Sequence, residues 1–267
     1  IDRVTSKTGY VKDYTLKELK KLTVMEKRFP AYPSSKIPTL EEVLDAVKAS
    51  GIWVNIELKT GIYWYPEIEQ KVAQIVQKCD MEQRVIYSSF NHYSIQKIKQ
   101  IVPEAETAYL YSDVIWNVTD YAKNTKVDGI HPAVYHIKMA DFLNEYIKSG
   151  LNVRVWTVND TTDMKWLIEA GVTAVITNYP DVAVKIREQR DEILRKKSRE
   201  VNIKVIKYIY SEYLSLSNII RLKRIDDIVN LLDMETFVKQ IKEFYLENKG
   251  DAACLIYGIY GGDEALK

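Results

Sequence analysis

Hydrophobic and polar residues alternate along the first 180 positions in a way that predicts strands and helices in turn. Short apolar runs typical of strands occur at 52–58, 85–90, 107–111, 127–131, 153–158 and 174–177. Between most of them, apolar residues recur at helical spacing, at about 68–75, 95–101, 139–147 and 166–168. This order predicts six parallel strands joined by right-handed crossovers.

Two capping boxes predict where helices begin ahead of the first of these strands. Thr15 is followed three residues later by Glu18, and Thr39 by Glu42. Six strand–helix units within this length suit a (β/α) barrel better than an open sheet, although the alternation alone is compatible with both.

The pattern changes after Pro180. Seven of the ten residues 191–200 are charged, and no strand–helix alternation follows. Residues 201–247 carry apolar stripes at helical spacing. We therefore predict two regions, one of alternating strands and helices over 1–186 and a small α-helical region over 187–267.

Composition narrows the class of protein. The chain has 267 residues with 38 basic and 37 acidic side chains, and the resulting net charge of +1 gives no reason to expect a nucleic-acid partner. Cys79 and Cys254 are far apart, which argues against a disulfide scaffold or a zinc ribbon. No apolar run approaches ~18 residues, so we expect no transmembrane segment in this chain. The start at Ile1 rather than Met suggests a cut through a longer protein.

The run 52–59 carries the strongest chemical signal. Alternate residues from Ile52 to Leu58 are apolar, and the intervening Asn55, Glu57 and Lys59 share the other face of the strand. A carboxylate and an ammonium are costly to desolvate in a parallel sheet. In barrels, however, active sites lie at the carboxyl ends of the strands. The pair is therefore either a structural ion pair at a strand exit or, as we favour, part of a metal or phosphate site.

Other candidates follow later strands. Trp156 either packs in the core or forms an apolar wall beside a ligand, and Ser89 either contacts a ligand or packs at a strand end. His92 and His131 also fall at strand exits, where a lone histidine more often makes hydrogen bonds than acts as a base. No nucleophile elbow, P-loop, dinucleotide fingerprint or H-E-x-x-H motif occurs.

Seven segments, in order along the first 185 residues or so, resemble the glycerophosphodiester phosphodiesterase family. Their counterparts in the family are D-R-T-T, T-L-x-E-L-K, I-P-T-L-E-E-V, N-I-E-I-K, S-S-F-D-H, V-W-T-V-N and I-T-D-Y-P-D. In this chain they are Asp2–Thr5, Tyr14–Lys20, Ile37–Val43, Asn55–Lys59, Ser88–His92, Val155–Asn159 and Ile176–Asp181. Each match is weak alone, but seven in order form a specific signal.

The resemblance implies a TIM-type (β/α) barrel that hydrolyses small glycerophosphodiesters to glycerol 3-phosphate and an alcohol. It implies a divalent cation, Ca²⁺ or Mg²⁺, with Glu57 as a metal ligand and catalytic carboxylate. Lys59 takes the place of the lysine beside the substrate phosphate. Phe90 and Trp156 would bind substrate by lining the pocket near its glycerol part.

The family's first two strands, which carry its H-R-G, E-x-D and H-D motifs, precede the segment that matches Asp2–Thr5. We therefore expect an α/β fold with a TIM-type barrel lacking its first two strands, and an isolated chain that is inactive and self-associates through open barrel edges. The location would be cytoplasmic, or membrane-tethered through an N-terminal region. One alternative is a non-catalytic partial-barrel interaction protein; another is a phospholipase D-like toxin on the same fold.

Overall fold

The computed structural model describes residues 1–2, 4–24, 35–139 and 141–214, with side chains described as far as residue 197. The chain divides into two units, Ile1–Tyr179 and Pro180–Lys267, and each is described by itself.

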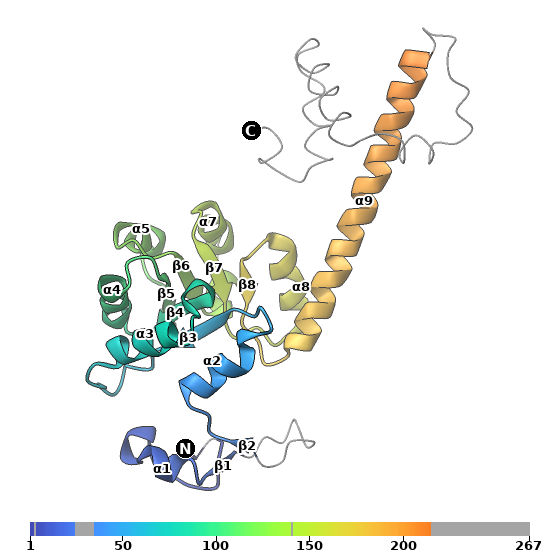
Figure 1. The fold of residues 1–267 in the computed structure, drawn as a ribbon. Coiled ribbons are helices and arrows are strands. Elements are labelled where there is room, and N and C mark those ends of the chain that lie inside the picture. Colours follow the sequence, from blue (N-terminus) through green and yellow to red (C-terminus); the bar gives the residue numbers. More distant parts are fainter. Residues whose placement is uncertain (3, 25–34, 140, 215–267) are drawn as a thin grey trace. The chain divides into compact units, whose positions relative to one another are not determined.

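A six-stranded parallel sheet forms the centre of the first unit (Figure 1). The strands pair in chain order, as in a barrel, which the predicted strand–helix alternation allowed but did not by itself require. They are β3 (Val54–Glu57), β4 (Val85–Ser89), β5 (Glu106–Tyr111), β6 (Gly129–Pro132), β7 (Asn152–Val155) and β8 (Ala174–Val175). All six predicted strands are confirmed, with bounds that differ by one to three residues.

Helices precede and connect the strands of this sheet, and those between strands lie on one side of it (Figure 1). They are α2 (Leu40–Lys48), α3 (Ile68–Lys78), α4 (His92–Ile101), α5 (Val118–Asn124), α6 (Val134–Ile137), α7 (Phe142–Lys148) and α8 (Thr161–Ala170), with a 3₁₀ turn η2 (Glu82–Arg84) before β4. Gly150 and Gly171, with φ of 77° and 86°, follow α7 and α8. A helix often ends at a residue in the left-handed conformation, and glycine adopts it without steric strain because it has no Cβ.

The sheet is strongly curved. Phe90 follows β4 and Trp156 follows β7, three strands further along, yet their ring centroids lie 5.3 Å apart. Side chains three strands apart on a flat sheet would be separated by roughly 14 Å. The two rings therefore face each other across the concave side, as they would inside a barrel.

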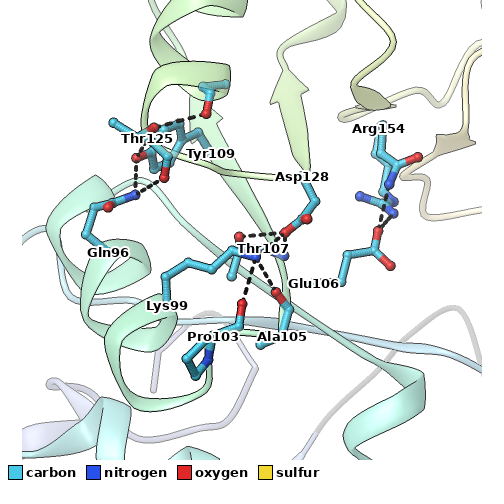
Figure 2. Close-up of polar contacts among 12 residues, drawn as sticks. Gln96, Lys99, Pro103, Ala105, Glu106, Thr107, Tyr109, Thr125, Asp128 and Arg154 are labelled. Carbon is cyan, nitrogen blue, oxygen red and sulfur yellow. Dashed lines mark hydrogen bonds and ion pairs between the residues drawn. The ribbon is translucent and has the colours of Figure 1, made fainter.

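The convex side packs against the helices. Tyr109 of β5 stacks on His92 of α4, with centroids 3.9 Å apart, and on Tyr121 of α5 at 4.9 Å. Its hydroxyl accepts a hydrogen bond from Gln96 and donates one to Thr125 (Figure 2). Because alternate residues of β5 face opposite ways, the residues on either side of Tyr109 point to the concave face.

A small N-terminal segment precedes the sheet. It contains η1 (Val11–Asp13), α1 (Leu16–Leu19) and an antiparallel pair, β1 (Thr23–Val24) and β2 (Ser35–Lys36). Both predicted capping boxes are confirmed: Thr15 caps α1 and Thr39 caps α2 through the backbone N–H three residues later. An ion pair between Lys20 and Glu42 joins this segment to α2.

Two local predictions were wrong, and one helix was missed. The first strand begins at Val54 rather than Ile52, because pairing with β4 begins there, and Ile52 and Trp53 are more than half exposed. The run 139–147 is not one helix: α7 begins only after Asp141, and Met139 lies outside it. The short helix α5 was not predicted, since its buried face includes Thr119 beside its few apolar residues.

The second unit is described through helix α9 (Pro180–Leu214). This helix runs through the predicted boundary at 186/187, and the division into domains at that point stays a prediction. The helical stripes predicted beyond residue 214 lie outside the described residues. Among the helices described, none combines the length and the hydrophobicity needed to cross a membrane.

Candidate active site at the carboxyl edge

Glu57 and Lys59 form an ion pair where β3 ends. The Lys59 Nζ lies 2.6 Å from Glu57 Oε1. The Glu57 side chain is 29% exposed and that of Lys59 is 75% exposed, so the carboxylate is partly buried while the lysine side chain faces solvent. An ammonium has three donors. Lys59 can therefore bind an anion while it keeps its bond to Glu57.

The backbone around Lys59 is fixed to β4. The Leu58 N–H donates to Ser88 O at 2.8 Å, and the Ser89 hydroxyl donates to Leu58 O at 2.6 Å. The Asn91 amide then donates to Thr60 O at 3.2 Å. Ser89 is thus fully buried and bonded to backbone, which favours its packing role over the ligand contact considered from the sequence.

A buried polar chain anchors the same loop from the helix side. The Thr60 and Ser94 hydroxyls lie 2.7 Å apart, and Ser94 donates to Glu69 Oε1 at 2.6 Å. Lys97 pairs with the other oxygen of Glu69 at 3.7 Å. All three linking side chains are nearly inaccessible to water, so they hold the residues after Lys59 in one position.

Phe90 and Trp156 form the second pair of predicted site residues. Their rings meet edge to face, at an interplanar angle of 86°. The Trp156 indole N–H donates to His131 O at 2.7 Å, which fixes the ring, while Phe90 remains 44% exposed. The structure thus joins Glu57 to Lys59 and Phe90 to Trp156, as two pairs at the carboxyl edge of one curved sheet.

A polar cluster on the concave face was not identified from the sequence. Arg154 of β7 forms an ion pair with Glu106 of β5 (Figure 2). Its Nη1 lies 3.3 Å from His131 Nε2, and Asn152 also donates to Glu106, at 3.0 Å. A Cβ on Gly129 would lie 3.0 Å from Arg154 Nη1 and 2.7 Å from Asn152 O, so only glycine fits there. Charged residues at alternate positions of apolar strands were the signal that could have found this cluster.

Burial fixes His131 as a neutral side chain. Desolvation, with a smaller contribution from the adjacent Arg154 charge, lowers the pKa of His131 to about 3. A guanidinium can only donate, so His131 Nε2 is the acceptor and Nδ1 carries the proton. Neither His131 Nδ1 nor Ser88 Oγ has a hydrogen-bond partner among the described residues.

His92 is also a hydrogen-bonding residue, as its position at a strand exit suggested. Its Nε2 lies 3.0 Å from Leu110 O and its Nδ1 lies 3.2 Å from the Tyr121 hydroxyl. Burial lowers the pKa of His92. These contacts place His92 between α4, α5 and the convex side of the sheet, away from Glu57.

The described residues do not by themselves fit a divalent-cation site. Among them, no group of three or more His, Cys, Asp or Glu side chains could hold a metal ion. Ca²⁺ takes six to eight oxygen ligands and Mg²⁺ six. Glu57 offers one carboxylate, and that carboxylate is already paired with an ammonium.

Comparison with known proteins identifies the protein family to which this chain is similar. The model of the glycerophosphoryl diester phosphodiesterase family matches residues 1–182. A glycerophosphodiester phosphodiesterase from Bacillus altitudinis is 38% identical over 195 residues, covering 71% of this chain and 78% of the relative. Another, from Caldanaerobacter subterraneus, is 35% identical over 186 residues, covering 70% and 76%.

Solved structures agree. A glycerophosphodiester phosphodiesterase from Parabacteroides distasonis superposes with a TM-score of 0.56 at 26% identity, over 66% of this chain and 72% of that one. The chain belongs to the glycerophosphoryl diester phosphodiesterase family, a family of phosphoric diester hydrolases. The predicted family and the TIM-type α/β fold class are confirmed.

Proposed function

We propose that this protein hydrolyses glycerophosphodiesters to glycerol 3-phosphate and an alcohol at the carboxyl edge of its sheet. That the isolated chain is inactive stays a prediction, which the assay below also tests. The observation that carries the proposal is the Glu57–Lys59 pair, because it places an exposed ammonium on a fixed backbone where barrel enzymes bind substrate. Membership of the family supports it, as do the names of the two relatives above.

In this proposal Lys59 binds the phosphodiester. Its ammonium neutralises a non-bridging oxygen, and charge that develops on that oxygen during attack strengthens the contact. Glu57 orients the ammonium. The rings of Phe90 and Trp156 meet edge to face, and in this proposal they contact the C–H groups of the glycerol part of the substrate.

We also propose that a divalent cation, Ca²⁺ or Mg²⁺, binds with Glu57 as its one proposed protein ligand. We assign no chemical step to the cation. One carboxylate leaves most of the coordination shell to water. We therefore expect Ca²⁺ binding no tighter than about 1 mM, the weak end of the range for protein sites. Calorimetric titration measures it, and Glu57→Gln should abolish it. Micromolar binding would show that ligands beyond Glu57 take part.

Release of glycerol 3-phosphate from glycerophosphocholine tests the activity, measured with and without Ca²⁺ or Mg²⁺. Lys59→Met should lower kcat/KM about 100-fold, the usual loss when one charge-stabilising donor is removed. Lys48→Met is the matched control. It removes an exposed ion pair, Lys48 to Asp80 at 2.9 Å, between helix ends near the opposite edge, and should leave the rate unchanged.

The alternative is a non-catalytic partial-barrel protein. It is favoured because, among the described residues, no group of three or more His, Cys, Asp or Glu side chains could hold a metal ion. The same assay separates the two. A wild-type chain that releases no glycerol 3-phosphate, yet binds glycerol 3-phosphate in a manner abolished by Lys59→Met, would be a binding protein.

A further inference from the structure

Large apolar side chains are exposed in four consecutive connections at the carboxyl edge. Together they form what we call the mouth rim: Ile62, Trp64, Tyr93, Val114, Trp116 and Tyr135. They follow β3, β4, β5 and β6 in turn, so they surround the edge that carries Glu57 and Lys59.

The exposure of the mouth rim is high. Ile62 and Trp116 are each 88% exposed, the highest values among large apolar side chains in the described part of the chain. Tyr93 and Trp64 follow at 65% and 57%. Single exposed apolar residues are ordinary on a protein surface. A set of them on one edge, from four separate connections, marks a surface that is covered in use.

The chemistry of the rim favours a lipid surface as its partner. Trp and Tyr combine an apolar body with a polar group, and they concentrate where membranes meet water. Two lysines accompany them, each paired with a carboxylate. Lys97 pairs with Glu69 and its Nζ lies 4.9 Å from the Trp64 ring centroid. Lys59 pairs with Glu57 and is three-quarters exposed at the same edge, with donors left for an anion. Ammonium groups beside interfacial aromatic rings match the phosphates of lipid headgroups.

We propose that the mouth rim binds this protein to the surface of a phospholipid bilayer, with Trp116, Ile62 and Trp64 inserted at headgroup depth. Docking in this way turns the carboxyl edge toward the lipid phosphates. The docking itself does not depend on catalysis, so it is tested without turnover.

The test is co-sedimentation of the full chain with vesicles of phosphatidylcholine, and with vesicles of phosphatidylcholine and phosphatidylglycerol in equal parts. Wild-type protein should bind both, and the anionic vesicles more tightly. Trp116→Ser should weaken partitioning roughly tenfold, the effect of removing one buried aromatic side chain. Ile62→Ser, in a different connection, should act in the same direction.

Trp53→Ser is the matched control. Trp53 is 54% exposed but precedes β3, at the opposite edge of the sheet, and its removal should leave vesicle binding unchanged. Wild-type protein that stays in solution with both vesicles overturns the proposal. So does a Trp53→Ser loss equal to that of Trp116→Ser, and so does a self-associating chain that Trp116→Ser converts to monomer, because the rim would then be a protein interface.

Discussion

The two edges of the parallel sheet use polar groups in opposite ways. At the amino edge, Lys99 donates to Ala105 O and pairs with Asp128, both at 2.8 Å, and Asp128 also accepts from the N–H and the hydroxyl of Thr107 (Figure 2). At the carboxyl edge, Lys59 has one partner described and stays three-quarters exposed. The hydrogen bonds at the amino edge stabilise the fold, whereas the carboxyl edge leaves donors and aromatic rings exposed, where they can contact ligands.

This difference follows from how (β/α) units are connected. At the amino edge, polar side chains pair with one another, as the buried Thr107 does with the partly exposed Asp128. Connections at the carboxyl edge present side chains to solvent. Buried hydrogen bonds such as that between Thr60 and Ser94 fix the position of the loop and leave the exposed side chains free to contact ligands. Changes at the amino edge should therefore alter stability and leave activity intact, while changes at the carboxyl edge should do the reverse.

The largest effect on stability is expected from Arg154→Met. Arg154 is 7% exposed and forms the ion pair with Glu106 that secures the concave face. Its removal leaves a part-buried carboxylate without its charge partner, so the free energy of unfolding should fall by about 3 kcal/mol. Urea unfolding measures it. Lys165→Met removes an exposed pair with Glu169 and should change stability by less than ~0.5 kcal/mol; equal losses in both variants would contradict the role of burial.

Asp128→Ala should have the next largest effect. It removes the acceptor of both Thr107 donors and the partner of Lys99, so we expect a loss of about 2 kcal/mol in the free energy of unfolding. Phosphodiesterase activity at low temperature should not change, because the substitution lies at the amino edge. An activity loss larger than that of Lys59→Met would refute the division of roles between the edges.

The pH dependence of the free energy of unfolding tests the role of His131, which lies beside Arg154 on the concave face. Burial lowers the pKa of His131 to about 3, whereas the unfolded chain takes up the proton near the ordinary value of 6.5. The stability that neutral His131 contributes is complete above pH 6.5. It is lost as the pH falls toward 3, at up to ~1.4 kcal/mol per pH unit. In His131→Asn the unfolding free energy should vary less over this window; an unchanged pH profile would contradict the prediction.

The smallest effect concerns the sides of the sheet rather than its ends. Within the described residues, β3 and β8 each pair on one side only, so their outer backbone groups are open to another strand. We expect self-association that increases with concentration in analytical sedimentation. Asn55→Lys, a charge on the exposed edge strand, should weaken it severalfold, and Asn124→Lys on α5 should not. A single monomer at all concentrations would exclude this prediction.

Much of the fold was predictable from the sequence because it depends on local patterns. Apolar periodicity located all six strands, and the threonine–glutamate spacing located the starts of α1 and α2. Errors arose where local signals were weak, at the start of β3 and at the break before α7. The location within the cell and the helical region beyond residue 214 stay predictions.

The candidate site was predictable only in part. The parity of β3 placed Glu57 and Lys59 on one face, and two-residue spacing is enough to bring them into contact. The buried chain from Thr60 through Ser94 to Glu69 gave no such signal, because its members are 34 and 25 residues apart.

The sequence by itself determined the positions of the strands, the helix starts and the residues that can pair within one strand, since these depend on neighbours along the chain. The tertiary structure decided the contacts across strands. Phe90 meets Trp156 only because the sheet curves, and Arg154 reaches Glu106, 48 residues earlier, only because the register of three strands aligns them. Curvature and register are set by the packing of the whole sheet against its helices, which no local pattern contains.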